Sequence, residues 1–318
     1  MRIKAPGFRL GCAIEVDFSP DGQLLATVGR NTVLWSVTNR HRLRSTRLLR
    51  HPSATTFSPD GAQLLVKSTS GDLHLCEAAT GDPLWHYRSS GHDEGPGALF
   101  AAPQIIADAS WNGSLVLRDL ASSSVTTLWR EENSMIGTLT RARDRWAFTS
   151  RRKHSHPRFA DRASAGCIVV SDALLQGQFR TVDRAWDGLS SIALSPIGDA
   201  VAVRYGARES ALDVIRISTG ERLASSPCST GGTGDDLAWS PDNRAIVLVE
   251  KGGFSFRDVS TLREIGWLPS QYPSHVKFAP DGSLIALGDW SAGIVVAWPS
   301  LLDGLSPREI TALGPSAS

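Results

Sequence analysis

The sequence predicts an all-β protein made of seven repeated units, each a small sheet of four antiparallel strands. A phrase ending in Ser-Pro-Asp-Gly, or a close variant of it, recurs along the chain at intervals of 39 to 45 residues. The chain has 318 residues with 29 Gly and 17 Pro, a composition typical of many short strands joined by turns. The segments between strands lack a helical period of useful length, which argues against alternating strands and helices.

The first strand of each unit runs into the recurring turn, where Pro sets φ and Gly accepts the left-handed conformation. Clear copies of the phrase cover residues 16–22, 55–61, 192–198, 237–243 and 276–282, and a weaker copy covers 98–103. Two ordinary periods separate Pro103 from Pro196. We therefore expect one further unit that has lost its proline, with strands at 136–139, 145–149 and 167–171.

Three more strands follow the turn in each unit. A second apolar strand is predicted at 23–28, 63–66, 200–203, 245–249 and 283–287. Tight turns such as Asn112-Gly113 lead to a third strand, at 32–35, 73–76, 115–118, 254–257 and 294–298. A fourth opens with Thr-Gly at 80–84 and 219–223. Since propeller blades have this period, the predicted fold is all-β: a seven-bladed β-propeller of four-stranded antiparallel blades.

On these repeats, the chain resembles the WD40 and WD40-like repeat β-propeller family of bacterial type. The resemblance implies one propeller domain over residues 1–302, followed by a tail at 303–318 that is a short helix, a strand or disordered. It implies that one terminus completes the last blade, with residues 2–10 favoured over the C-terminal segment 307–313. The family's network of His, Asp and Trp would fall on His275, Asp289 and Trp298.

Charge and cysteine usage exclude several classes of protein. Lys and Arg number 33 against 32 Asp and Glu, which disfavours a wholly basic nucleic-acid binder and an acidic disordered chain. The four cysteines lack metal or redox spacing, so we interpret them as four separate buried thiols in a reducing compartment, which favours a cytoplasmic protein. We expect neither an export signal nor a membrane span. The apolar stretch 284–302 contains Asp289 and Pro299, which favours two strands around a turn.

Enzyme signatures are missing, including the nucleophile elbow, the phosphate-binding loop and the His-Glu zinc motif. We therefore expect no catalytic residue, no metal and no cofactor. The predicted function is a non-catalytic protein–protein interaction scaffold or adaptor that presents the rim of the propeller to a partner protein. Exposed Trp and Tyr dominate the binding energy of many interfaces, and the loops of one face carry Trp111, Trp186, Tyr272 and Trp290.

The longest predicted loop, at 150–166, is basic. It would present a positively charged patch to an acidic partner through Arg151, Arg152, Lys153 and Arg158. The partner itself is unidentified. We expect the chain to be a monomer or one member of a hetero-complex that contacts no membrane.

Two alternatives remain open at this point. One is a channel-mouth hydrolase or lactonase-like enzyme, which would use the histidines and the acidic residues Asp93, Glu94, Glu131, Glu132, Asp235 and Asp236. The other is association with nucleic acid through the basic strip 40–50, which contains five Arg and no acidic residue. We favour a structural interpretation of this strip, because charges on an outermost strand prevent edge-to-edge pairing.

Overall fold

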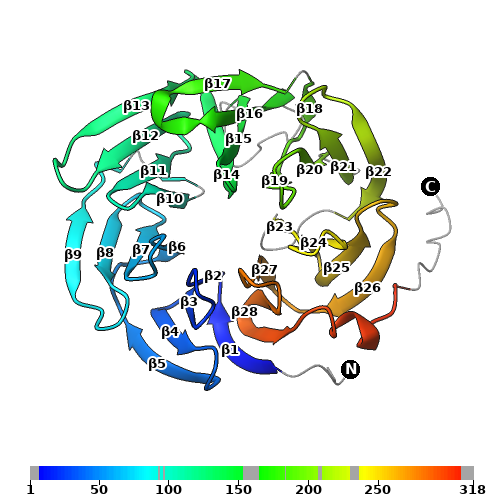
Figure 1. The fold of residues 1–318 in the computed structure, drawn as a ribbon, viewed down its shortest axis with the longest axis horizontal. Coiled ribbons are helices and arrows are strands. Elements are labelled where there is room, and N and C mark those ends of the chain that lie inside the picture. Colours follow the sequence, from blue (N-terminus) through cyan, green and yellow to red (C-terminus); the bar gives the residue numbers. More distant parts are fainter. Residues whose placement is uncertain are drawn as a thin grey trace, which may run out of the picture.

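The computed structural model describes residues 7–91, 94–95, 97–152, 165–182, 184–206, 210–229 and 236–308. Its strands form seven sheets that stand around a central channel as the blades of a propeller (Figure 1). In the first six blades, consecutive strands pair in chain order from the channel to the perimeter. The predicted all-β fold, a seven-bladed propeller of four-stranded antiparallel blades, is confirmed.

Blades 1 and 2 correspond to clear copies of the repeated phrase, and blade 3 corresponds to the weaker copy at 98–103. Blade 1 consists of β2 (Glu15–Phe18), β3 (Leu24–Val28), β4 (Thr32–Ser36) and β5 (His41–Thr46). Blade 2 consists of β6 (Pro52–Phe57), β7 (Gln63–Ser68), β8 (Leu73–Glu77) and β9 (Pro83–Tyr87). Blade 3 consists of β10 (Gly97–Ala102), β11 (Ile105–Ala109), β12 (Ser114–Asp119) and β13 (Val125–Arg130).

Blade 4 is the unit without the proline, and its first three strands contain the segments predicted at 136–139, 145–149 and 167–171. It consists of β14 (Ser134–Ala142), β15 (Arg145–Arg152), β16 (Ala165–Ala173) and β17 (Gln178–Thr181), and β18 (Trp186–Asp187) also pairs with β16. Blade 5 consists of β19 (Ser191–Leu194), β20 (Ala200–Tyr205), β21 (Ser210–Arg216) and β22 (Arg222–Cys228). Blade 6 consists of β23 (Leu237–Trp239), β24 (Ala245–Glu250), β25 (Gly253–Asp258) and β26 (Glu264–Pro269).

Blade 7 is assembled from both ends of the chain. Its innermost strand is β27 (Pro273–Phe278), followed by the long β28 (Leu284–Ala297). The first half of β28 pairs with β27, whereas the second half pairs with β1 (Gly7–Ala13). The two ends of β28 lie side by side. The N–H of Trp298, directly after the strand, donates to the carbonyl of Ser283, directly before it, at 2.8 Å. β28 therefore supplies the second and third strands of this blade.

The N-terminal strand closes the ring, as favoured from the sequence. β1 lies on the outer side of blade 7 and pairs with it antiparallel, Arg9 standing opposite Ile294 (Figure 1). The alternative, closure by residues 307–313, is wrong for Pro307 and Arg308, the two residues of that segment that the structure describes. Ser306 and Arg308 contact β26 of blade 6 instead, while residues 309–318 lie outside the described residues.

In the turns formed by the Ser-Pro-Asp-Gly phrase, the aspartate side chain fixes the geometry of the backbone. In blade 1 the hydroxyl of Ser19 donates to Asp21 at 2.6 Å, and the same carboxylate accepts the N–H of Gln23 at 3.0 Å. Gly22 follows with a φ of 70°, in the left-handed region that glycine adopts without strain. Blade 5 has Ile197 in place of the aspartate, and there Ser195 donates to Asp199 at 2.7 Å.

The core lies between neighbouring blades. Apolar residues of β1, β2 and β28 pack together where blade 7 meets blade 1, including Leu10, Val16, Phe18 and Val295. The described helices are two three-residue 3₁₀ turns, η2 (Leu174–Gln176) and η3 (Leu302–Gly304), and neither could span a bilayer. All four cysteines lie in the described part of the chain, and each is a free thiol.

Candidate interaction surfaces and the central channel

Two of the predicted rim aromatics lie next to each other on blade 7. Tyr272 precedes β27 and is 44% exposed, and Trp290 lies at the turn within β28 and is 47% exposed. The N–H of Trp290 donates to the carbonyl of Tyr272 at 3.1 Å. Their exposure agrees with the expectation, and their role in binding stays a prediction.

Asp289 holds the two loops that carry these rings. Its carboxylate accepts the N–H groups of Tyr272 at 3.0 Å, Ser291 at 2.6 Å and Ala292 at 2.8 Å, and it accepts the hydroxyl of Ser270. Burial alone would raise the pKa of Asp289, but these hydrogen bonds outweigh it and lower the pKa to about 2. The aromatic pair is thus presented by loops that are already ordered.

Trp111 is exposed on the same kind of loop in another blade. It lies in the turn between β11 and β12 of blade 3, is 39% exposed, and donates its N–H to the carbonyl of Glu94 at 2.6 Å. Blade 3 is three blades away from blade 7 around the ring (Figure 1). Trp111 is therefore separate from the pair formed by Tyr272 and Trp290.

The expectation that Trp186 is exposed on the rim is wrong. Its ring is only 2% exposed and packs with Ile168, Val182 and Leu189 in the core between blades 4 and 5. The reason is the short strand β18, which pairs with β16 and draws the tryptophan inward. A pairing between segments 20 residues apart is not visible in the repeat pattern.

The predicted basic loop is described only at its start. Arg151 and Arg152 form the end of β15, whereas Lys153 and Arg158 lie outside the described residues. Arg151 is half-buried and donates from Nη1 to the carbonyl of Leu189 at 3.2 Å, so part of its hydrogen-bonding capacity is used within the protein. Arg152 is exposed.

The basic strip 40–50 lies mainly on β5, at the perimeter of blade 1 (Figure 1). Arg40 is in the turn before β5 with a φ of 56°, and a bulge interrupts the strand between Arg42 and Arg44. The three arginines therefore do not form the single regular face that strict alternation predicts. Their place on an outermost strand agrees with protection of an exposed edge.

Charged side chains lie in the central channel, and the sequence reasoning had not singled out Glu15, Asp17 or Lys277 among them. The channel has a volume of about 620 Å³ and is lined by the innermost strands. Lys277 Nζ lies 3.0 Å from Asp17 Oδ1, and His275 Nε2 lies 3.4 Å from Asp236 Oδ2. Part of the signal was present in the charged residues that alternate with an apolar one at 15–17 and 275–277, where the corresponding positions of blades 2, 3 and 5 are uncharged.

These side chains connect one blade to the next. Glu15 Oε1 accepts the N–H of Thr55 at 3.2 Å, and Asp236 Oδ2 accepts the N–H of Val276 at 3.0 Å. Asp17 Oδ2 likewise accepts a blade 2 N–H, that of Phe57, at 3.0 Å. The channel carboxylates therefore satisfy backbone donors of neighbouring blades.

His275 extends this pattern to the seam between the last blade and the first. Its Nδ1 accepts the N–H of Val16 at 3.4 Å. Burial lowers the pKa of His275, despite the opposing charge of Asp236, so the ring is neutral at pH 7 and can accept at Nδ1.

The expected network of His275, Asp289 and Trp298 does not form. Trp298 Nε1 donates instead to Asp242 Oδ2 of blade 6 at 2.9 Å. Asp289 accepts the N–H of Tyr272 and so holds the loop before β27. Asp289 and Trp298 are nine positions apart in the sequence, and the second half of β28 separates them, because Trp298 directly follows the end of that strand. Trp298 is thus anchored to the neighbouring blade.

Of the acidic residues proposed for a channel-mouth enzyme, the structure describes Glu94, Glu131, Glu132 and Asp236, and no three of these are grouped as a metal site would require. Glu131 accepts a hydrogen bond from the hydroxyl of Ser150 at 2.5 Å, and Asp236 accepts one from the N–H of Val276. Asp93 and Asp235 lie outside the described residues. Within the described ranges, no three His, Cys, Asp or Glu side chains are grouped so that they could hold a metal ion.

Comparisons with known proteins agree with this architecture. No protein-family model and no curated protein matches the sequence. Among solved structures, hydrazine synthase of Kuenenia stuttgartiensis is 13% identical with a TM-score of 0.71, over 94% of this chain and 97% of that one. The β-propeller domain of Myceliophteria thermophila Cps50 (Swd1) is 13% identical with a TM-score of 0.71, over 92% and 98%.

The WD40 repeats of RRP9 are similar to the chain to the same degree. They are 12% identical with a TM-score of 0.69, over 93% of this chain and 100% of that one. At such identities the likeness concerns the fold and no residue's role. The chain therefore has the fold of the WD40-repeat β-propellers.

Proposed function

We propose that this protein is a non-catalytic scaffold that binds a partner protein through the surface formed by Tyr272 and Trp290. The observation that carries the proposal is the exposure of this adjacent pair. Of the ten tryptophans, only Trp111 and Trp290 are exposed, and Trp290 has an exposed tyrosine beside it. Tyr and Trp combine a large apolar area with a polar atom, and they are enriched among the residues that dominate interface energies.

The rigidity of the loops that carry Tyr272 and Trp290 supports a role in binding a partner protein. Asp289 accepts hydrogen bonds from three backbone N–H groups and two hydroxyls of the segments around the pair, so the rings are presented by a rigid element. A preorganised surface loses less conformational entropy when a partner binds. Function on ordered loops above a stable sheet is common in such folds.

The channel favours the same proposal over an enzyme. Glu15, Asp17 and Asp236 each accept a backbone N–H of a neighbouring blade, which is a structural role. The exposed Arg152 supports an acidic partner, and the four free thiols support a cytoplasmic location.

The test is capture of partners from an extract of the source cells, quantified by mass spectrometry. The wild-type chain is compared with the double variant Y272A/W290A and with a matched control, L43A/L84A. Leu43 and Leu84 are 48% and 52% exposed, but they lie on the outermost strands β5 and β9. We expect proteins that wild type and control retain and that Y272A/W290A loses by tenfold or more, since each hot-spot aromatic contributes about 2 kcal/mol.

All three chains must show the same thermal unfolding midpoint, because the altered side chains are exposed. Equal recovery of every captured protein by Y272A/W290A would overturn the proposal. Turnover of a lactone or ester by the wild-type chain, abolished by a substitution in the channel, would support the enzyme alternative instead.

A further inference from the structure

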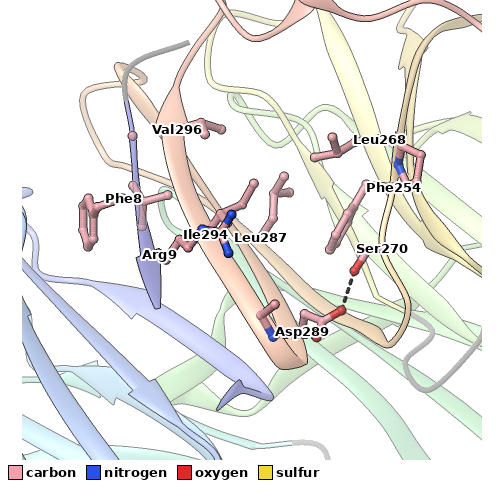
Figure 2. Close-up of a pocket in the computed structure, with 13 residues that line it drawn as sticks. Phe8, Arg9, Phe254, Leu268, Ser270, Leu287, Asp289, Ile294 and Val296 are labelled. Atoms are coloured by element: carbon pink, nitrogen blue, oxygen red, sulfur yellow. Dashed lines mark hydrogen bonds between the residues drawn. The ribbon is translucent and has the colours of Figure 1, made fainter. Parts of the chain in front are cut away.

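A cavity of about 730 Å³ lies between blade 6 and blade 7 (Figure 2). Its walls are mainly apolar, and they come from the facing surfaces of the two blades. Blade 6 contributes Phe254 and Leu268, and blade 7 contributes Leu287, Ile294 and Val296. This volume is within the range of about 300–1,000 Å³ that is usual for small-molecule sites.

β1 brings a positive charge to this cavity. Arg9 stands directly opposite Ile294 in the antiparallel pair, so the two side chains lie on the same face of the sheet (Figure 2). The neighbouring Phe8 faces the other way and packs against Trp35 of blade 1, with ring centroids 6.1 Å apart. Alternation along β1 therefore directs Arg9 to the blade 6 side.

The charge of Arg9 is not compensated within the described part of the chain. Its side chain is exposed, and it forms no ion pair or hydrogen bond with a described residue. Asp289 is the one carboxylate among the lining residues, and its oxygens already accept the hydrogen bonds of Ser270, Tyr272, Ser291 and Ala292. An apolar cavity thus has a free guanidinium at its edge.

We infer that this cavity binds a small amphipathic carboxylate. The apolar part of the ligand would lie between Phe254, Leu268 and Ile294, where contact with buried apolar walls removes it from water. The carboxylate would accept two parallel hydrogen bonds from Arg9, whose planar fork matches that geometry. Neither Tyr272 nor Trp290 lines this cavity, so it differs from the partner surface proposed above, although Asp289 borders the cavity and also holds the loops of that surface.

The experiment measures binding of cis-parinaric acid, a fluorescent fatty acid, to the full chain, with its methyl ester as the uncharged comparison. We expect saturable binding of one molecule per chain and at least tenfold weaker binding of the ester. R9Q should also weaken binding of the acid at least tenfold, because the charged hydrogen bonds are lost. The matched control R42Q removes an exposed arginine of β5 and should bind as wild type does.

A second variant tests the cavity independently of the charge. Ala292 is exposed at the edge of the cavity, so A292W should obstruct it without disturbing the core, and it should reduce binding of the acid and the ester alike. Equal affinity for acid and ester, or an R9Q chain that binds like wild type, would overturn the inference. So would binding seen only after residues 1–6 are removed, because that segment of the chain would then be the occupant.

Discussion

Glu15 ionises in the channel at a much higher pH than it would in water. Burial raises its pKa to about 8, although the hydrogen bond from Thr55 N–H opposes the rise. The charge of Asp236 raises the pKa further, that of Lys277 lowers it, and that of Asp17 raises it. At neutral pH Glu15 is therefore mostly protonated, and its hydrogen bond to blade 2 is made by a neutral acid.

This shift predicts a pH dependence of stability that E15Q removes. The folded pKa of about 8 exceeds the ordinary value of 4.5, so the folded state holds the proton more tightly than the unfolded state. The stabilisation is complete below pH 4.5 and is lost as the pH rises towards 8 and beyond. Urea unfolding at pH 5, 7 and 9 should show wild type losing stability relative to E15Q as the pH rises.

Glu132, an exposed glutamate in the loop before β14 of blade 4, supplies the control. E132Q should leave the pH profile of wild type unchanged. A difference between wild type and E15Q that stays constant from pH 5 to pH 9 would contradict the prediction. His275, Asp236, Asp17 and Lys277 face the same channel and are unaltered in both variants.

At the scale of the structural element, the chain after blade 7 is bound to the outside of blade 6. Arg308 Nη2 lies 2.6 Å from Glu250 Oε2 and 2.6 Å from Glu264 Oε2, and its guanidinium lies 3.9 Å from the ring centre of Trp267. Burial alone would lower the pKa of Arg308, but the two carboxylates outweigh it and raise the pKa. Glu250 is fully buried, so it depends on its cationic partners.

We expect R308A to lower the free energy of unfolding by about 1–3 kcal/mol, because Glu250 keeps Arg257 at 3.2 Å but loses one charged partner. R308K should recover only part of this loss, since an ammonium group cannot reproduce the planar fork. R216A is the control: Arg216 and Glu221 form an exposed pair, worth about 0–1 kcal/mol. Urea unfolding at pH 7 measures all three, and equal losses in R308A and R216A would contradict the expectation.

At the scale of the whole molecule, the ring is held closed by β1. This strand supplies the perimeter of blade 7 and buries Leu10 and Ala13 where blade 7 meets blade 1. His275 adds a hydrogen bond across the same seam, to the N–H of Val16. Without β1, the second half of β28 would present an unpaired edge, which is a site of aggregation.

Deletion of residues 1–13 should therefore cost several kcal/mol and promote self-association. Removal of a buried leucine such as Leu10 costs about 2–5 kcal/mol by itself. Thermal unfolding and light scattering after size exclusion would measure the two effects. Deletion of residues 309–318 is the comparison, and we expect it to leave the unfolding midpoint nearly unchanged. A fully stable monomer after deletion of 1–13 would show that β1 is dispensable.

Much of the fold was predictable because blades are encoded locally. The Ser-Pro-Asp-Gly phrase positions a strand, a turn and the next strand through contacts within a few residues, such as Ser19 with Asp21. Even blade 4, without its proline, was found from period alone. The exposure of Trp290 was also predictable from its place in a tight turn. Trp186 was not, because the pairing of β18 with β16 decides its burial.

The number of blades and the positions of most strands and turns follow from the sequence alone, because short-range patterns are repeated at a fixed period. Closure by the N-terminal segment was favoured only through the resemblance to WD40-like propellers, and the pairing of β1 with β28 establishes it. The contacts between blades depend on the tertiary structure: Trp298 with Asp242, His275 with the N–H of Val16, and Arg9 with the cavity beside blade 6. Such contacts depend on how segments 56 to 259 residues apart are placed by the ring, and a local pattern contains no information on that placement.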